Sequence, residues 1–181
     1  MNIRIAGLVL AFALTASLSG VVPQRALAAA SEYELKAAFL VNFAKFVEWP
    51  AAAFDTSASP VLVGVVGDDP FGPDLDNTVR GKLFGGRSMD VKRFDWRDDL
   101  TGFHIVFISA SEQRRLKDIL RPLETTSILT VSDMDDFCTQ GGVIALVSVK
   151  ERIRFEVNRA AARRRGLKIS SRLLSLATAV H

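Results

Sequence analysis

Short apolar runs alternate with helix-like stretches along most of the chain, and this alternation restricts the folds that it can adopt. The helix-like stretches lie near residues 71–81, 111–122 and 133–140. The apolar runs around them span residues 61–66, 88–94, 103–109, 127–131 and 143–149. Strands that alternate with helices predict a mainly parallel sheet with helices on both faces.

The apolar runs differ in ways that predict their places in the sheet. "FHIVFIS" and "VIALVSV" are nearly continuous in their apolar character, as central strands are. The run at 88–94 alternates Met89 and Val91 with polar residues, which is typical of a half-exposed edge strand. After a tight turn at Lys150 and Glu151, "RIRFEV" predicts a last, antiparallel strand. We therefore predict an α/β fold, a Rossmann-like three-layer sandwich with a mainly parallel sheet of five to six strands.

A long helix is predicted before the first strand. Residues 32–49 carry two apolar series at helical spacing, which indicates a wide buried face. Ser31 is expected to cap this helix, with Glu34 completing a capping box. Pro50 is expected to end it.

Two short helices are predicted after the last strand. Asn158 is expected to cap a basic helix that Gly166 stops. The stretch "SSRLLSLATAV" then predicts a final amphipathic helix that begins at Ser170 or Ser171.

The first segment of the chain predicts export. Arg4 precedes an apolar stretch over residues 6–22, and the sequence Ala-Leu-Ala at 26–28 supplies the small residues that signal peptidase requires. We expect residues 1–28 to be a signal peptide that is cleaved after its last alanine, with an uncleaved anchor as the alternative. Residues 29–181 then form a single domain, which is long enough for a sizeable core.

The stretch "GVVGDDPFG" begins like a phosphate-binding P-loop, because two of its glycines are separated by four residues. A P-loop continues with Lys and then Ser or Thr, whereas this chain has Pro73 and Asp74. Asp68 and Asp69 would also repel a phosphate. We expect instead the end of a strand, followed by a helix that Asp68 or Asp69 caps and Pro70 begins.

The chain lacks the sequence motifs of common enzymes and metal sites. It contains no G-x-S-x-G elbow, no H-E-x-x-H and no cysteine and histidine at a credible spacing. His104 stands inside an apolar run and His181 is the last residue, so no spaced pair of metal ligands exists. Cys138, the only cysteine, is either a buried small side chain or a thiol that pairs between chains. The aspartates at 133–140 are expected to cap a helix. We predict no enzymatic activity, no metal and no cofactor.

Positive charge is concentrated near the carboxyl end. Without residues 1–28 the net charge is +1, yet residues 150–172 carry nine cations and two acids, so the remaining part carries −6. Such asymmetry creates a local field that attracts an anionic ligand or an acidic protein face. Export makes nucleic acid an unsuitable partner.

Several blocks of this sequence resemble the YfiR family of bacterial periplasmic proteins in content and order. They are "LKAAFLVNFAKFVEWP", "GVVGDDPFG", "HIVFIS", "ILTVSD", "CTQGGVIALV", "RIRFEVN" and "GLKISSRLLSLA". The resemblance implies a Rossmann-like α/β fold and export to the periplasm. For the founding member it also implies repression of an inner-membrane diguanylate cyclase through that enzyme's periplasmic sensor part.

One position departs from the family pattern. Better-known members are similar in having a cysteine pair around the "GG" segment, whereas here Ala145 stands where the partner of Cys138 is expected. The redox regulation that such a bond implies is therefore not carried over to this chain.

The resemblance and the charge pattern favour an interaction protein, which binds the periplasmic domain of an inner-membrane diguanylate cyclase or sensor kinase and represses it. The alternative is a periplasmic sensor that binds a small metabolite, anionic if it uses the basic segment, at the carboxyl ends of the strands. A homodimer is also open. The candidate partner-binding or ligand-binding residues are Lys36, Asn42, Trp49, Arg152, Arg154, Asn158, Arg163, Lys168 and Arg172.

Each candidate also has a structural interpretation. Trp49 is either an interface anchor or a core residue, and Asn42 either faces a ligand or fastens its helix to the "FEVN" strand. Arg152 and Arg154 are expected to share the solvent face of their strand. Arg163 and its two neighbours point to different sides of a helix, where they also suit the dipole of its carboxyl end.

Overall fold

The computed structural model describes residues 24–181, so most of the predicted signal peptide lies outside the described residues. The helices in chain order are α1 (Gln24–Phe43), η1 (Ala51–Ala53), α2 (Pro73–Val79), η2 (Ala110–Arg115), α3 (Leu116–Leu123), α4 (Arg159–Arg164) and α5 (Ser171–Leu176). The strands are β1 (Val47–Glu48), β2 (Val61–Val66), β3 (Met89–Phe94), β4 (Ile105–Ile108), β5 (Leu129–Ser132), β6 (Ile144–Val149), β7 (Arg152–Val157), β8 (Lys168–Ile169) and β9 (Ala179–Val180).

Seven strands form one mixed, mostly parallel sheet in the order β3-β2-β4-β5-β6-β7-β9. Strands β2 to β6 are mutually parallel, and β7 returns antiparallel to β6 as predicted. In chain order the parallel strands read 2-1-3-4-5, which is the flavodoxin-like order and differs from the Rossmann order. The predicted count of five to six strands was too low, because the two residues of β9 add a seventh strand beside β7.

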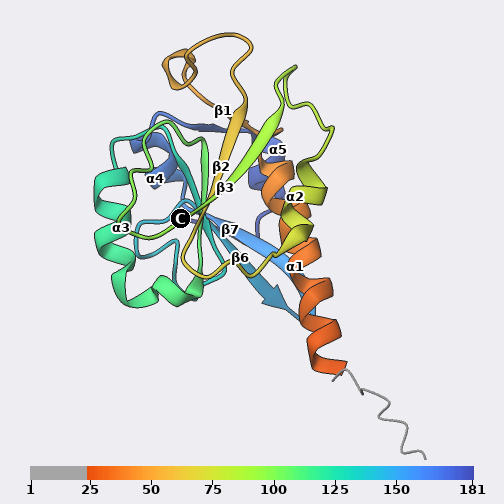
Figure 1. Ribbon diagram of the computed structural model, residues 1–181. Coiled ribbons are helices and arrows are strands. Elements are labelled where there is room, and N and C mark those ends of the chain that lie inside the picture. Colours follow the sequence, from red (N-terminus) through yellow and green to blue (C-terminus); the bar gives the residue numbers. More distant parts are fainter. Residues whose placement is uncertain (1–23) are drawn as a thin grey trace, which may run out of the picture.

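Two apolar cores lie on opposite faces of the sheet. Helices α1 and α2 pack on one face, where β2 contributes Val63 and Val65, and helix α3 packs on the other, where β2 contributes Val66 (Figure 1). Alternate residues of a strand point to opposite faces, so β2 must be apolar on both sides. All residues of β4 are buried, as predicted for a central strand, and so are those of β5. The other strand that was predicted to be central, β6, lies inside the sheet, but only its first three residues are buried. Strand β3 lies at an edge, as predicted.

Helix α1 differs at both ends from the prediction. It begins at Gln24 and continues through Ser31, which therefore does not cap it. The sequence before Ser31 is rich in alanine, the strongest helix former. The helix ends at Phe43, and the chain then forms β1, which pairs antiparallel with β8. Within residues 24–181, no helix has the length and apolar character needed to cross a membrane.

The predicted helix at 133–140 is absent. These residues form turns between β5 and β6 instead. Asp136 has a φ of 58°, which is incompatible with a continuous helix. Phe137 and Cys138 then turn into the core beneath α3. This turn segment supplies polar groups to two clusters that are described below.

The capping predictions near the carboxyl end are confirmed. The Asn158 side chain accepts a hydrogen bond from the backbone of Ala161 at the start of α4, and Gly166 follows this helix with a φ of 72°. Ser170 caps α5 by accepting from Leu173. The final helix is shorter than predicted, because its last residues form β9.

Candidate functional site

The fold distributes the predicted basic residues over separate surfaces. Arg152 and Arg154 are exposed on one face of β7, as predicted from their alternation with buried residues. Arg163 and Lys168 instead line a shallow pocket of about 180 Å³ together with Arg159. The basic segment is therefore not one continuous patch.

The three consecutive arginines at the carboxyl end of α4, of which Arg165 directly follows the helix, also point to different sides, as predicted. Arg163 and Arg164 are exposed, whereas Arg165 is only 2% exposed and donates to the carbonyl of Gly141. Burial lowers the pKa of Arg165 from its ordinary value. This cation therefore belongs to the core of the protein and not to its surface.

Lys36 and Asn158 are occupied by internal contacts. The Nζ atom of Lys36 lies 2.7 Å from Asp133 and 2.6 Å from Glu32, and the residue is buried. The Asn158 side chain caps α4 and also donates to the carbonyl of Cys138 at 2.7 Å. Both residues therefore make contacts that stabilise the fold.

Trp49 lies at the amino-terminal edge of the parallel strands. Its indole donates to the carbonyl of His104 at 3.2 Å, and its ring packs against the apolar core. The His104 imidazole is buried and stacked on Phe54, with Nε2 donating to Ala53 and Nδ1 accepting from Leu62. The structure thus favours the core interpretation of Trp49.

The free energy of unfolding is expected to fall as the pH drops below about 6.5, the ordinary pKa of histidine. Burial lowers the pKa of His104 in the fold, so the unfolded chain binds a proton there that the folded chain does not. The stability should fall by up to about 1.4 kcal/mol per pH unit until the folded pKa is reached. The free energy of unfolding in urea should lose this pH dependence in His104→Gln. The control His181→Gln, which changes an exposed residue, should keep it. Equal slopes in both variants would contradict the lowered pKa, because His104 would then bind its proton equally well in the folded and the unfolded chain.

Asn42 lies at an exposed position and does not fasten α1 to β7. The α1 face that packs on β7 is formed by Phe39 and Phe43, whose rings contact Phe155. An amide at position 42 therefore points beside this face, into solvent.

Asn42 instead lines a groove between α1, α5 and β7, which we call the α1–α5 groove. Its volume is about 310 Å³ and its lining is mostly apolar. Leu176, on the α5 side, is 57% exposed. The guanidinium of Arg172 lies 5.8 Å from the ring of Phe46, which is one of the residues that line the groove. The lining residues are Phe39, Asn42, Phe43, Lys45, Phe46, Phe155, Leu173 and Leu176.

The loop in "GVVGDDPFG" packs against side chains of η2 at Gly67. Gly67 has a φ of 85°, and the side chains of Ser111 and Glu112 lie directly against it. Asp68 and Asp69 do not cap α2 and Pro70 does not begin it, in contrast to the prediction, because Gly72 precedes this helix and Pro73 is its first residue. Asp69 instead forms an ion pair with Arg93.

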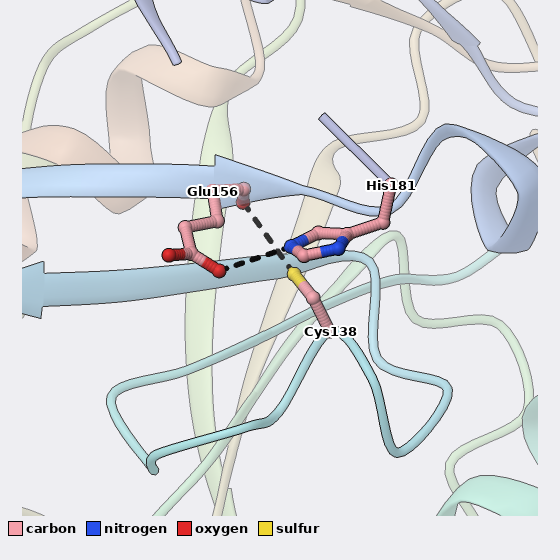
Figure 2. A group of neighbouring side chains, drawn as sticks. All are labelled: Cys138, Glu156 and His181. Carbon is pink, nitrogen blue, oxygen red and sulfur yellow. Dashed lines mark hydrogen bonds and ion pairs between the residues drawn. The ribbon is translucent and has the colours of Figure 1, made fainter. Parts of the chain in front are cut away.

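The fold also gathers three side chains that the sequence kept far apart. Cys138, Glu156 and His181 lie together where the turn segment, β7 and the carboxyl terminus meet (Figure 2). Sequence reasoning missed this cluster because no local spacing relates the three residues.

Comparisons with known proteins agree with this architecture. No curated protein matches the chain. Among solved structures, a conserved domain protein from Vibrio cholerae O1 biovar El Tor strain N16961 aligns with a TM-score of 0.52 at 12% identity. The alignment covers 84% of this chain and 60% of that protein, so the chain spans less than two thirds of its relative. At this identity the likeness shows the fold alone.

The family comparison covers most of the domain. The model of the YfiR/HmsC-like family matches residues 33–178, which include the second half of α1, the whole parallel sheet, the turn segment and α5. The protein belongs to the YfiR/HmsC-like family, whose members are periplasmic regulators in cyclic di-GMP signalling.

Proposed function

We propose that this protein is a periplasmic, non-enzymatic regulator that binds the periplasmic part of a membrane-bound diguanylate cyclase and represses it. The observation that carries the proposal is the α1–α5 groove, an apolar surface bordered by cations in a chain of this family. An apolar groove between helices suits an amphipathic segment of a partner protein.

The charges at the groove indicate the chemistry of the partner segment. Lys45 lines the groove and Arg172 lies over the ring of Phe46, whereas no Asp or Glu is among the lining residues of this described part. A partner segment with apolar side chains on one face and carboxylates beside them would match this surface. Such charge complementarity mainly increases the association rate and the specificity.

The alternative, a metabolite sensor, is less well supported at the carboxyl ends of the strands. There the side chains of Ser111 and Glu112 lie against Gly67, at the switch point between β2 and β4 where α/β sheets of this order bind ligands. The α1–α5 groove is at the lower limit of about 300 Å³ for small-molecule sites. The groove could therefore hold only a small apolar metabolite, and this metabolite would compete with the partner.

Leu176→Glu is expected to abolish repression without unfolding the protein. Leu176 is 57% exposed, so the fold tolerates the change, but the new carboxylate repels an acidic partner segment. In cells that lack the native gene, wild-type protein should lower cyclic di-GMP and Leu176→Glu should not. The matched control is Leu83→Glu, at a leucine that is 68% exposed and lies outside the groove, and it should repress normally. Full repression by Leu176→Glu at equal protein levels would contradict this docking site.

A further inference from the structure

Cys138, Glu156 and His181 present three metal-binding atoms to one another. Figure 2 shows the Cys138 sulfur beneath the imidazole of His181, with the Glu156 carboxylate beside the ring. One ligand atom from each residue can be chosen so that all three lie within 4.8 Å of one another. Thiolate, imidazole and carboxylate are the ligand types that Zn²⁺ uses in proteins.

One of the three distances between the ligand atoms is close to that in a tetrahedral zinc site. Bond lengths of about 2.0–2.3 Å place zinc ligands about 3.3–3.6 Å apart. The Nε2 atom of His181 lies 3.1 Å from a carboxylate oxygen of Glu156. Both side chains are about one third exposed, at 35% and 32%, and can rotate to approach the buried sulfur of Cys138. Binding therefore requires these two partly exposed side chains to move toward the sulfur.

Hydrogen bonds to their backbone groups hold Cys138 and His181 in place. Asn158 donates to the carbonyl of Cys138 at 2.7 Å. The backbone of His181 donates to Val157 at 2.8 Å, and its carbonyl accepts from Arg159 at 2.9 Å. The last residue of the chain is thus anchored beside β7, and such fixation lowers the entropic cost of binding a metal.

We propose that Cys138, Glu156 and His181 form a site for Zn²⁺, with the fourth coordination position open to water. The thiolate and the carboxylate neutralise the two charges of the ion, and neutral imidazole completes the set. Binding releases the proton of the thiol to solvent, so no oxidant or reductant takes part. Without metal, burial raises the pKa of Cys138 to about 12, so the thiol is then protonated and inert.

The test is metal titration of the exported chain, purified without a histidine tag. We expect one Zn²⁺ per chain in competition with a chromophoric chelator, and a higher melting temperature with zinc. Co²⁺ should give the near-ultraviolet charge-transfer absorption of a thiolate ligand. Cys138→Ser should remove this absorption and weaken zinc binding by more than the about 10–100-fold effect of residues that only orient a ligand.

Two variants of partly exposed ligands test the site without changing the buried cysteine. His181→Ala and Glu156→Gln change partly exposed side chains, and each should weaken zinc binding at least about tenfold. The matched control is Glu151→Gln, at an exposed acid in the turn before β7, which should bind zinc normally. Cobalt binding without thiolate absorption, or equal affinity in all variants, would overturn the proposal. The readout is metal binding alone, so it does not depend on the cyclase proposal.

Discussion

Lys36→Met is expected to lower the free energy of unfolding by about 3–5 kcal/mol, because it leaves a buried carboxylate without its cation. The side chains of Lys36 and Asp133 are both 8% exposed, and Nζ lies 2.7 Å from Oδ2. The hydroxyl of Tyr33 donates to the same oxygen, whereas Oδ1 has no hydrogen-bond partner among the described residues. Removal of the lysine therefore leaves one hydrogen bond to hold a buried charge.

This loss should be independent of pH across the neutral range. Burial alone would lower the pKa of Lys36, but hydrogen bonds to Asp133 and Glu32 outweigh it and leave the pKa raised. The ion pair thus contributes its full stability below about 10.4, the ordinary pKa of lysine. It is lost only as the pH rises through the higher folded value.

Urea unfolding of three variants measures this effect. Glu32→Gln removes the more exposed carboxylate from the same lysine, at 42% exposure, and should cost no more than about 1 kcal/mol. The double variant Lys36→Met with Asp133→Leu should recover much of the loss, because it removes both charges. A loss below about 1 kcal/mol in Lys36→Met would show that the pair is as hydrated as a surface ion pair.

Gly142→Ala is expected to lower the free energy of unfolding by about 3 kcal/mol, at the upper end of the usual cost of overpacking. A Cβ atom at Gly142 would overlap the ring of Phe137. Phe137 is fully buried, so its ring has no free volume into which to move. The backbone of Gly142 also donates to the carbonyl of Phe137 at 2.9 Å, which keeps the two residues in contact.

The neighbouring glycine provides the matched control. Gly141 has a φ of 103°, yet nothing lies within 4 Å of a Cβ built there. Gly141→Ala should therefore lower the free energy of unfolding by backbone strain alone, which is about 1–2 kcal/mol. Phe137→Leu, which shortens the ring, should partly rescue Gly142→Ala. If both glycine variants lose the same stability in urea unfolding, the clash with Phe137 is relieved by movement of the turn segment.

The order of the strands along the chain could be predicted because it depends on local patterns. Val61–Val66 and Arg152–Val157 were bounded correctly by apolar periodicity and by the residues that flank them. Caps such as Asn158 and Ser170 were also readable, since a cap bonds to a backbone group only three residues away. The short β9 could not be predicted, because a two-residue strand has no period of its own.

The polar clusters depended on contacts between distant segments, which no local pattern records. Lys36 meets Asp133 across 97 residues of sequence, and both were assigned other roles from their neighbours alone. Asn42 was expected either to fasten α1 to β7 or to face a ligand, and the direction of α1 against β7 excludes the first, because it turns the side chain to solvent. The sequence by itself determined the long strands of the sheet, because hydrophobic burial acts through periodicity. Tertiary structure alone decided which charges are buried together and brought Cys138, Glu156 and His181 into one cluster, because side-chain proximity follows from how the elements pack.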